Sequence, residues 1–169
     1  MTSEPLQLRD ANPADFTDIL RLNAESVHFL SPLDLQRLTR LHGMAVYHRV
    51  VEWQGRVEAF LLGFREGSAY DSPNYGWFAA RYPQFLYIDR IVVGGSLQGQ
   101  GAGKHLYKDL MDFARRADVK TIGCEIDVDP PNEVSRRFHA ALGFSEVGSQ
   151  RYGATQKRVS LQVLDAHLR

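Results

Sequence analysis

The chain has 169 residues, enough for one domain that buries its own core without disulfides or metals. Its 20 basic residues balance 20 acidic residues, so the basic excess typical of nucleic-acid or membrane-surface proteins is missing. A lone cysteine, Cys124, excludes an internal disulfide and is typical of a reducing compartment. The sequence contains neither a run of about 18 apolar residues nor a signal-like N-terminus. We therefore expect a single cytoplasmic domain over residues 1–169, without membrane, nucleic-acid or metal partners.

The first part of the chain predicts a strand, two helices and a hairpin. Asn12 is an N-cap residue, and Pro13 follows it at the first helical position. Gln54-Gly55 separates two apolar-rich runs and indicates a hairpin turn. The expected elements are a strand over 6–10, helices over 13–27 and 33–42, and strands over 44–52 and 56–66.

The second part alternates strands with helices. Residues 67–83 are rich in Gly, Tyr, Pro and Asn, and this polar, broken composition predicts a long functional or mobile loop. After it we expect strands over 85–93, 121–128, 144–150 and 156–164, with helices over 103–117 and 133–142. Hairpins combined with crossovers predict an α/β fold, with a mixed sheet and helices on both of its faces.

A glycine-rich turn joins the strand over 85–93 to the helix that follows. Gly99, Gly101 and Gly103 alternate in the segment I-V-V-G-G-S-L-Q-G-Q-G-A-G-K (91–104). Glycine lets the backbone approach a ligand closely, and the free N–H groups of a helix N-terminus attract anions. The turn therefore predicts a phosphate-binding cradle. A turn that only reverses the chain is the alternative.

Spacing separates the possible phosphate-binding patterns. A Walker loop is excluded because Gln98 stands at its first glycine position and His105 follows Lys104. The dinucleotide fingerprint is excluded because, counted from Gly99, its third glycine is Lys104. The pattern that fits is [Gln/Arg]-x-x-Gly-x-[Gly/Ala], met by Gln98, Gly101 and Gly103.

With this pattern the chain resembles the GNAT superfamily of acetyl-CoA-dependent N-acyltransferases. A second block, N-E-V-S-R-R-F-H-A-A-L-G-F (132–144), is similar to the family's N-x-x-[AS]-x-x-F-[YH]-x-x-x-G-F ending. The clear resemblance covers residues 85–150, whereas the N-terminal half matches in element order alone. The resemblance implies a single-domain GNAT fold with about six to seven strands, acetyl-CoA as acyl donor and CoA as product.

The resemblance also implies two groups of cofactor-binding residues. The first group follows the pantetheine arm and the pyrophosphate. The second group belongs to the block over 132–144 and lines the other wall of the cofactor site. Asn132 can equally be a plain N-cap, and Phe138 a core aromatic. The implied residues are Ile91, Val92, Val93, Gln98, Gly99, Gln100, Gly101, Ala102, Gly103, Lys104, Asn132, Ser135 and Phe138.

The implied catalytic pair is Asp89 and His139. Asp89 matches the family's acidic residue that takes a proton from the incoming ammonium, although an ion pair with Arg90 is the alternative. His139 stands where the family often has the tyrosine that protonates the departing thiolate. An imidazole can carry that proton near neutrality, or it can be hydrogen-bonded without a catalytic role. Tyr107 and Tyr152 are possible substitutes as acid.

The resemblance also implies that the acceptor pocket is built from residues 26–33 and 70–78. The second segment is aromatic-rich and can be a lid over an apolar or aromatic amine or part of a satellite core. Glu125 and Asp127 share one strand face, where they can form an acidic pocket for a cationic acceptor or simply face solvent.

The first hypothesis is direct acetyl transfer to a primary amine of a small molecule in a ternary complex. The second makes the acceptor a protein N-terminus or lysine, and the third is a non-catalytic acyl-CoA-binding module. A homodimer is expected from the family resemblance.

Overall fold

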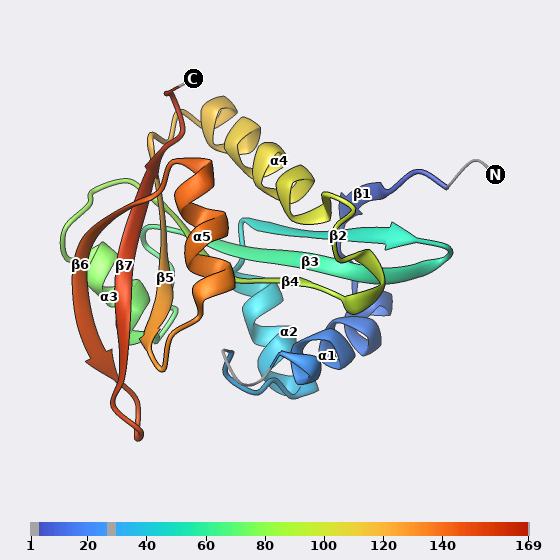
Figure 1. Ribbon diagram of the computed structural model, residues 1–169, viewed down its shortest axis with the longest axis horizontal. Coiled ribbons are helices and arrows are strands. Elements are labelled where there is room, and N and C mark those ends of the chain that lie inside the picture. Colours follow the sequence, from blue (N-terminus) through green and yellow to red (C-terminus); the bar gives the residue numbers. More distant parts are fainter. Residues whose placement is uncertain (1–3, 27–29, 169) are drawn as a thin grey trace. The chain divides into compact units, whose positions relative to one another are not determined.

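A computed structural model of the protein describes residues 4–26 and 30–168. Seven strands form one mixed sheet in the order β1-β2-β3-β4-β5-β7-β6 (Figure 1). This confirms the predicted mixed sheet of six to seven strands. The chain divides into two compact units, Met1–Phe64 with Asp89–Leu110, and Arg65–Ile88 with Met111–Arg169.

The first unit follows the predicted elements closely. The Asn12 side chain accepts a hydrogen bond from the Ala14 N–H, so the predicted N-cap is confirmed. Gln54 and Gly55 both adopt positive φ angles, of 52° and 75°, as a tight hairpin turn requires. The elements are β1 (Gln7–Asp10), η1 (Pro13–Asp15), α1 (Phe16–Glu25), α2 (Leu35–Met44), β2 (Tyr47–Trp53), β3 (Arg56–Arg65), β4 (Leu86–Val93), η2 (Gly95–Leu97) and α4 (Ala102–Arg116). Of β4 this unit includes the residues from Asp89 onward, and of α4 the residues up to Leu110.

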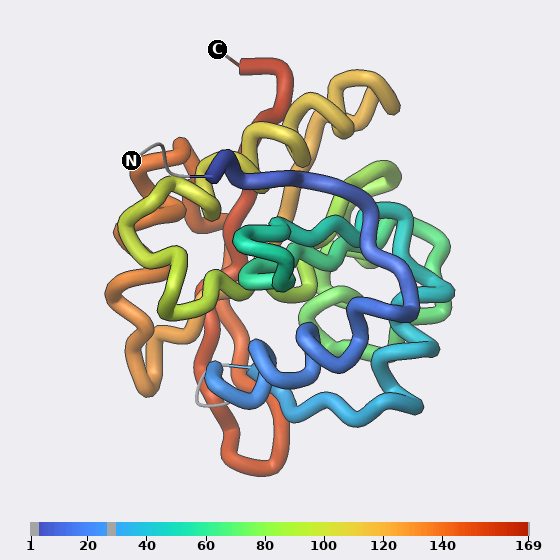
Figure 2. Tube along the Cα trace, turned by 90° about the vertical axis from the view of Figure 1, so that its right-hand side faces the viewer, coloured from blue at the N-terminus to red at the C-terminus, as the bar shows by residue number. Residues whose placement is uncertain are grey.

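The core of this unit lies between its helices and its strands. Phe16, Ile19 and Leu22 of α1 are buried with Leu38 of α2 against Phe60 of β3 and its neighbours. In Figures 1 and 2, α1 and α2 lie side by side below these strands, and the first turns of α4 lie above them. The predicted arrangement of helices on both faces is therefore confirmed within this unit.

The second unit contains α3 (Pro73–Ala79), the first residues of β4, the last turns of α4, β5 (Thr121–Asp129), α5 (Glu133–Leu142), β6 (Ser145–Tyr152) and β7 (Lys157–Asp165). Both α3 and α5 contact β5, and Figure 1 shows α5 in front of the strands and α3 behind them. Gly143 ends α5 in a left-handed conformation with φ of 104°, which glycine adopts without a steric penalty.

The prediction of a long loop over 67–83 is wrong in its centre, where the chain forms α3. Ser72 caps this helix by accepting from the Tyr75 N–H, and Pro73 occupies its first turn. Tyr75 and Phe78 are 3% and 0% exposed, so the helix contributes aromatic side chains to the core.

Two glycines of the sheet make room for α3. A Cβ atom on Gly123 would lie 2.6 Å from Phe78 Cε1, and one on Gly148 would lie 2.4 Å from Trp77 Cζ2. These separations are too short for real side-chain contacts. Glycine at both positions therefore lets the helix dock directly on β5 and β6.

Among residues 4–26 and 30–168, no helix has the length and apolar character needed to cross a membrane. Within the same residues, no group of three or more His, Cys, Asp or Glu side chains is placed to hold a metal ion.

Candidate active site

The glycine turn has the backbone conformation of an anion cradle. Gly99 and Gly101 have φ angles of 77° and 79°, a region that side chains other than glycine rarely adopt. Helix α4 begins at Ala102, and His105 donates its N–H to the Gly101 carbonyl at 3.0 Å. The Gln100 N–H donates to the Leu97 carbonyl at 3.1 Å, whereas the first N–H groups of α4, up to Lys104, precede the helical ladder and are oriented toward an anion at its N-terminus. The turn thus fits a pyrophosphate.

Side chains brace this turn from within. Gln98 Nε2 donates to the Val93 carbonyl at 3.0 Å, and Gln100 Nε2 donates to the Ser96 carbonyl at 3.0 Å. The Lys104 side chain is exposed in the first turn of α4. Lys104 is therefore placed to add positive charge beside the cradle.

The strand that leads into the turn alternates its faces. Val92 is 3% exposed, whereas Ile91 and Val93 are half-buried on the other face. Since successive side chains of a strand point to opposite faces, Asp89 shares the face of Ile91 and Val93. This part of the expected alternation is confirmed.

Asp89 forms an ion pair with its neighbour. Arg90 Nε lies 2.6 Å from Asp89 Oδ2, and both side chains are 5% exposed. Arg90 Nη1 also donates to Asn23 Oδ1 at 2.9 Å and to the Ser31 carbonyl at 3.1 Å. The ion pair anticipated as the alternative role of Asp89 is therefore present, and it holds the carboxylate in the middle of β4.

The second unit brings four of the expected residues together on α5. Asn132 Oδ1 accepts from the Ser135 N–H at 3.2 Å and caps the helix. His139 Nδ1 lies 2.7 Å from the Ser135 carbonyl and 3.2 Å from Ser135 Oγ. Phe138 meets the His139 ring edge-on, with centroids 5.7 Å apart. Asn132, Ser135, Phe138 and His139 thus form one connected cluster along the helix.

Contacts define the protonation state of His139. A carbonyl oxygen accepts only, so Nδ1 must carry the proton that it donates to Ser135. Burial lowers the pKa of His139 below its usual 6.5, although the hydrogen bond to Ser135 opposes this shift. The neutral ring with hydrogen on Nδ1 and a lone pair on Nε2 is therefore the favoured form at neutral pH.

The Glu125 and Asp127 carboxylates of β5 are partly or fully buried. Tyr87 donates its hydroxyl to Glu125 Oε2 at 2.6 Å. Asp127 is 6% exposed, and Lys157 Nζ lies 3.3 Å from its Oδ2. Burial raises the pKa of Asp127, and the nearby Lys157 charge opposes this rise. Exposure on a solvated strand face, the alternative for this pair, therefore does not describe Asp127.

Tyr87 is the residue of this group to which the sequence assigned no role. Its ring meets Tyr70, Tyr75 and Phe78 at centroid distances of 6.3, 5.6 and 5.8 Å. The two-residue spacing from Asp89 indicates that Tyr87 lies on the same face of the strand. The hydrogen-bond partner of Tyr87 on β5 could not be predicted, because it depends on how the two strands pair. Tyr87 pairs with Gly123, which places Glu125 one step along the same face.

The structure thus holds the predicted residues as two separate groups. Asp89, Ile91, Val92, Val93 and the turn from Gln98 to Lys104 lie in the first unit, and the α5 cluster lies in the second. Of the two acceptor segments, residues 70–78 contain α3, and residues 27–29 of the other segment lie outside the described residues.

Known acetyltransferases resemble this chain in sequence or in fold. The N-alpha-acetyltransferase RimI of Mycobacterium tuberculosis is 33% identical over 72 residues, which make up 42% of each chain. The structure of Ard1 from Thermoplasma volcanium matches 95% of this chain and 97% of its own with a TM-score of 0.78 at 17% identity. A putative acetyltransferase from Salmonella typhimurium, solved with its cofactor acetyl-CoA, matches 98% of this chain and 96% of its own with a TM-score of 0.72 at 19% identity.

These structural matches establish the fold. The model of the acetyltransferase (GNAT) family matches residues 13–144, a span that includes the glycine turn, the Asp-bearing strand and the α5 cluster. The chain therefore belongs to the GNAT acetyltransferase family.

Proposed function

We propose that the protein transfers an acetyl group from acetyl-CoA directly to a primary amine within a ternary complex. The observation that carries the proposal is the turn of two left-handed glycines that opens α4. Family membership supports the same reaction. Acetyl-CoA supplies an activated thioester, while the chain binds the phosphates, orients the amine and moves protons.

The residues proposed to hold the cofactor fall into the two groups described above. The turn from Gln98 to Lys104 binds the pyrophosphate through backbone N–H groups. By family resemblance, the backbone of Ile91, Val92 and Val93 is proposed to follow the pantetheine arm, and Asn132, Ser135 and Phe138 of α5 are proposed as further cofactor-binding residues.

We propose two candidates for the group that removes a proton from the acceptor ammonium. Asp89 is the candidate by family position, and its carboxylate is held in an ion pair by Arg90 at 2.6 Å. Asp127 is buried, and its pKa is raised, so its carboxylate binds a proton more readily than an exposed one. These environments favour Asp127 as the base and Asp89 as a residue that fixes the strand.

The contacts of His139 favour a proton acceptor over the acid first expected. Because neutral His139 donates from Nδ1 to the Ser135 carbonyl, its Nε2 carries a lone pair and has no proton to give. Acid catalysis would need the imidazolium, which burial disfavours. Tyr107, buried in α4, and Tyr152, half-buried at the end of β6, stay as alternative acids.

For the acceptor we favour the α-amine of a protein or peptide N-terminus. The aromatic segment 70–78 was the sequence feature that favoured a small aromatic amine, but Tyr75 and Phe78 fill the core of their own unit. The similarity to the N-alpha-acetyltransferase RimI over 42% of the chain supports a peptide acceptor. A small cationic amine is the second candidate, because the Glu125 carboxylate meets the Tyr87 hydroxyl within an aromatic cluster.

Cytoplasmic location is part of the proposal. Cys124 is free and 3% exposed, and burial raises the pKa of its thiol. Such a thiol is inert and suits a reducing compartment. A homodimer is proposed from the family resemblance alone.

The test is release of free CoA thiol from acetyl-CoA with three sets of acceptors. These are short peptides with free N-termini, the same peptides with blocked N-termini and an internal lysine, and small polyamines or aromatic amines. Turnover with the first set alone supports the N-terminal acceptor, and turnover with the third alone supports the small molecule. Binding of CoA with no turnover in any set would instead support the acyl-CoA-binding module.

The same assay distinguishes the two carboxylates. We expect Asp127→Asn to lower the rate at pH 7 by at least tenfold and to regain most of it above about pH 9, since an α-amine with a pKa near 8 then loses its proton unaided. Asp89→Asn should instead lower the rate by a similar factor at every pH. The reverse pattern would return the role of base to Asp89.

A further inference from the structure

Glu58 lies on β3, and its side chain is 9% exposed. A buried carboxylate is costly unless charges and hydrogen-bond donors compensate it. The contacts of Glu58 therefore show which groups compensate its burial and which segments it holds together.

Glu58 holds the start of the glycine turn at two points. Its backbone carbonyl accepts the Gly94 N–H at 2.8 Å, and its Oε2 accepts the Ser96 hydroxyl at 2.9 Å. One residue of β3 thus binds both the backbone and a side chain of the segment that leads into the phosphate cradle.

Gly94 packs against Glu58 without space for a side chain. A Cβ atom there would lie 2.9 Å from the Glu58 carbonyl oxygen and 2.9 Å from Leu22 Cδ2. Leu97, in the same turn, is 1% exposed. The segment from Gly94 to Leu97 is therefore seated closely on β3 and α1.

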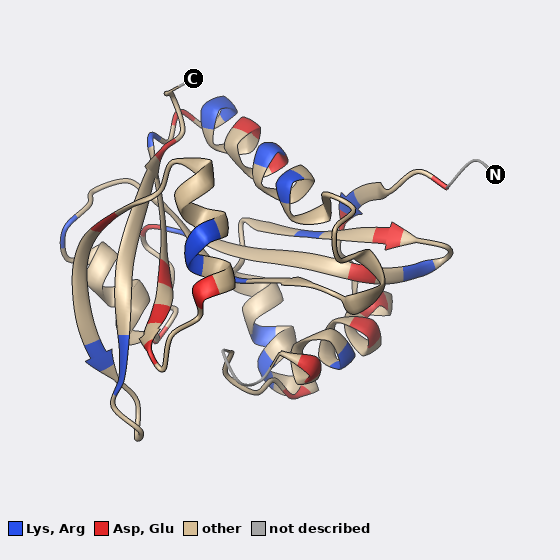
Figure 3. Ribbon diagram, viewed as in Figure 1, with Lys and Arg blue, Asp and Glu red and all other residues tan. Residues whose placement is uncertain are grey.

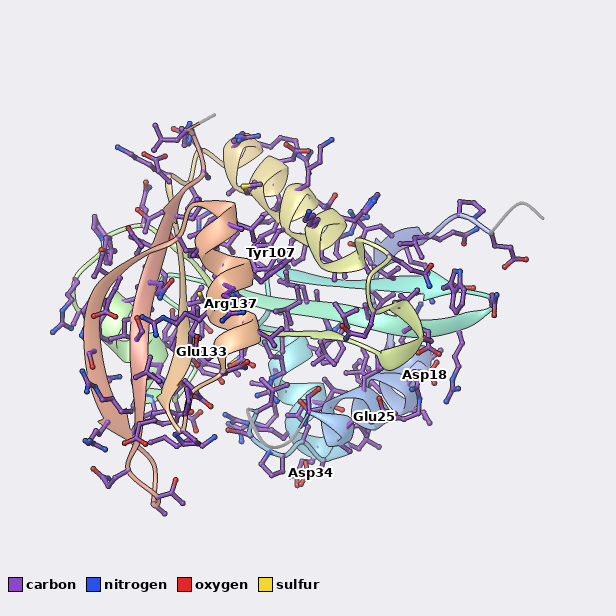
Figure 4. All side chains as sticks on the ribbon, viewed as in Figure 1. Asp18, Glu25, Asp34, Tyr107, Glu133 and Arg137 are labelled. Carbon is purple, nitrogen blue, oxygen red and sulfur yellow. The ribbon has the colours of Figure 1, made fainter. Side chains whose placement is uncertain are left out.

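Two arginines balance the charge of Glu58. Arg21 Nη2 and Arg56 Nε each lie 3.6 Å from Glu58 Oε1. Arg21 also lies within ion-pair distance of Asp18 and Glu25 on α1, both labelled in Figure 4. Figure 3 shows this mixture of acidic and basic bands along α1 and at the start of β3. One carboxylate oxygen thus faces the arginines, and the other is used by Ser96.

The turn beyond Ser96 depends on this attachment. The Ser96 carbonyl accepts from the Gln100 side chain, and the Gln98 side chain returns to the Val93 carbonyl. A shift of Ser96 would move Gln100 and hence the left-handed glycines on either side of it. Preorganised binding groups lose less entropy when the ligand binds.

We propose that Glu58 is a positioning residue that holds the phosphate-binding turn in its CoA-binding shape through Ser96 and Gly94. The inference rests on the proposed function, because it assigns Glu58 to the same cofactor site. Glu58 itself does not touch the cofactor in this assignment.

The test removes the hydroxyl that links the turn to Glu58. In Ser96→Ala we expect the Kd for CoA and the KM for acetyl-CoA each to rise about tenfold, the usual loss for a hydrogen bond to a charged group. The kcat should stay close to wild type, which separates positioning from catalysis, whereas the Tm of the ligand-free protein should fall modestly because Glu58 Oε2 loses a hydrogen-bond donor. Ser96→Thr keeps the hydroxyl and should restore affinity.

The matched control is Ser149→Ala. Ser149 is an exposed residue of β6, and its hydroxyl accepts a hydrogen bond from Arg158 of β7. This substitution should leave CoA binding unchanged. Wild-type CoA affinity in Ser96→Ala, or a loss confined to kcat or Tm, would overturn the inference and leave the proposed function standing. A wild-type protein that binds no CoA would overturn both.

Discussion

His48 is a buried imidazole in the core of the first unit, and its ring is 8% exposed. Its Nδ1 lies 2.8 Å from Nδ1 of His42, and its Nε2 is buried without a hydrogen-bond partner among the described residues. Phe60 packs against the ring at a centroid distance of 6.3 Å, and Asp15 is the nearby acid. Because an orphaned N–H costs more than an orphaned lone pair in apolar surroundings, His48 is expected to donate from Nδ1 to His42.

The buried His48 predicts a loss of stability in acid. Burial, followed by the His42 charge, lowers its pKa from 6.5 to about 4. The unfolded chain therefore binds a proton below pH 6.5 that the folded chain refuses until about pH 4. Stability falls across this window as the pH drops, by about 3 kcal/mol in total.

Denaturant unfolding at pH 7 and pH 4.5 measures this effect. His48→Gln keeps a donor for His42 and should lose about two thirds or more of the acid-induced drop in unfolding free energy. His167→Gln, at an exposed position near the C-terminus, is the control and should behave as wild type. An unchanged pH dependence in His48→Gln would assign the acid sensitivity to other groups.

At the scale of elements, α3 is the part that the sequence pattern misjudged. Ser72-Pro73 is the same start signal as Asn12-Pro13, which correctly predicted the first helix. The seven-residue length of α3 and its Gly76 gave no helical periodicity to follow. The helix is stabilised instead by packing against Gly123 and Gly148, which are distant in the chain.

Adding a methyl group at Gly123 should therefore weaken the second unit. The new Cβ would lie 2.6 Å from Phe78 Cε1, so Gly123→Ala is expected to destabilise the fold by about 1–3 kcal/mol through overpacking. Gly76→Ala is the matched control, because a Cβ there meets nothing within 4 Å and favours the helix by about 0.5–1 kcal/mol. Thermal unfolding of both variants measures the difference in Tm. Equal Tm values would show that α3 shifts to accommodate the extra methyl group without a loss of stability.

At the scale of the whole molecule, ligand binding is linked to stability. Cofactor that binds the folded chain alone stabilises it by about 2.7 kcal/mol at a concentration of 100 times the Kd, which raises the Tm by about 5–10 °C in a chain of this size. Gly101→Trp should abolish this CoA-dependent rise, because its side chain would occupy the cradle.

The control for this variant is Gly153→Trp in the turn between β6 and β7. Its φ of 78° matches the 79° of Gly101, and a Cβ there meets nothing within 4 Å. Both variants therefore carry the same backbone strain, but only Gly101→Trp blocks the proposed site. A normal CoA-dependent Tm shift in Gly101→Trp would remove the glycine turn from the phosphate site.

The sequence by itself determined the elements other than α3, and its motifs carried the resemblance to the family. Local signals decided these features: the cap at Asn12, the turn at Gln54-Gly55, the alternation along β4 and the spacing of Gln98, Gly101 and Gly103. Each depends on residues within a few positions of one another, so each can be recognised from composition and period alone.

The tertiary structure decided which partner each functional side chain has. Burial of Asp127 beside Lys157, the bond between Tyr87 and Glu125, and the seating of Ser96 on Glu58 all join residues 30 or more positions apart. The sequence could name Asp89 and His139 as ionisable candidates and Arg90 as an alternative ion-pair partner, but not that burial lowers the pKa of His139. Proton affinity depends on desolvation and on neighbouring charges, and both arise only when distant segments pack together.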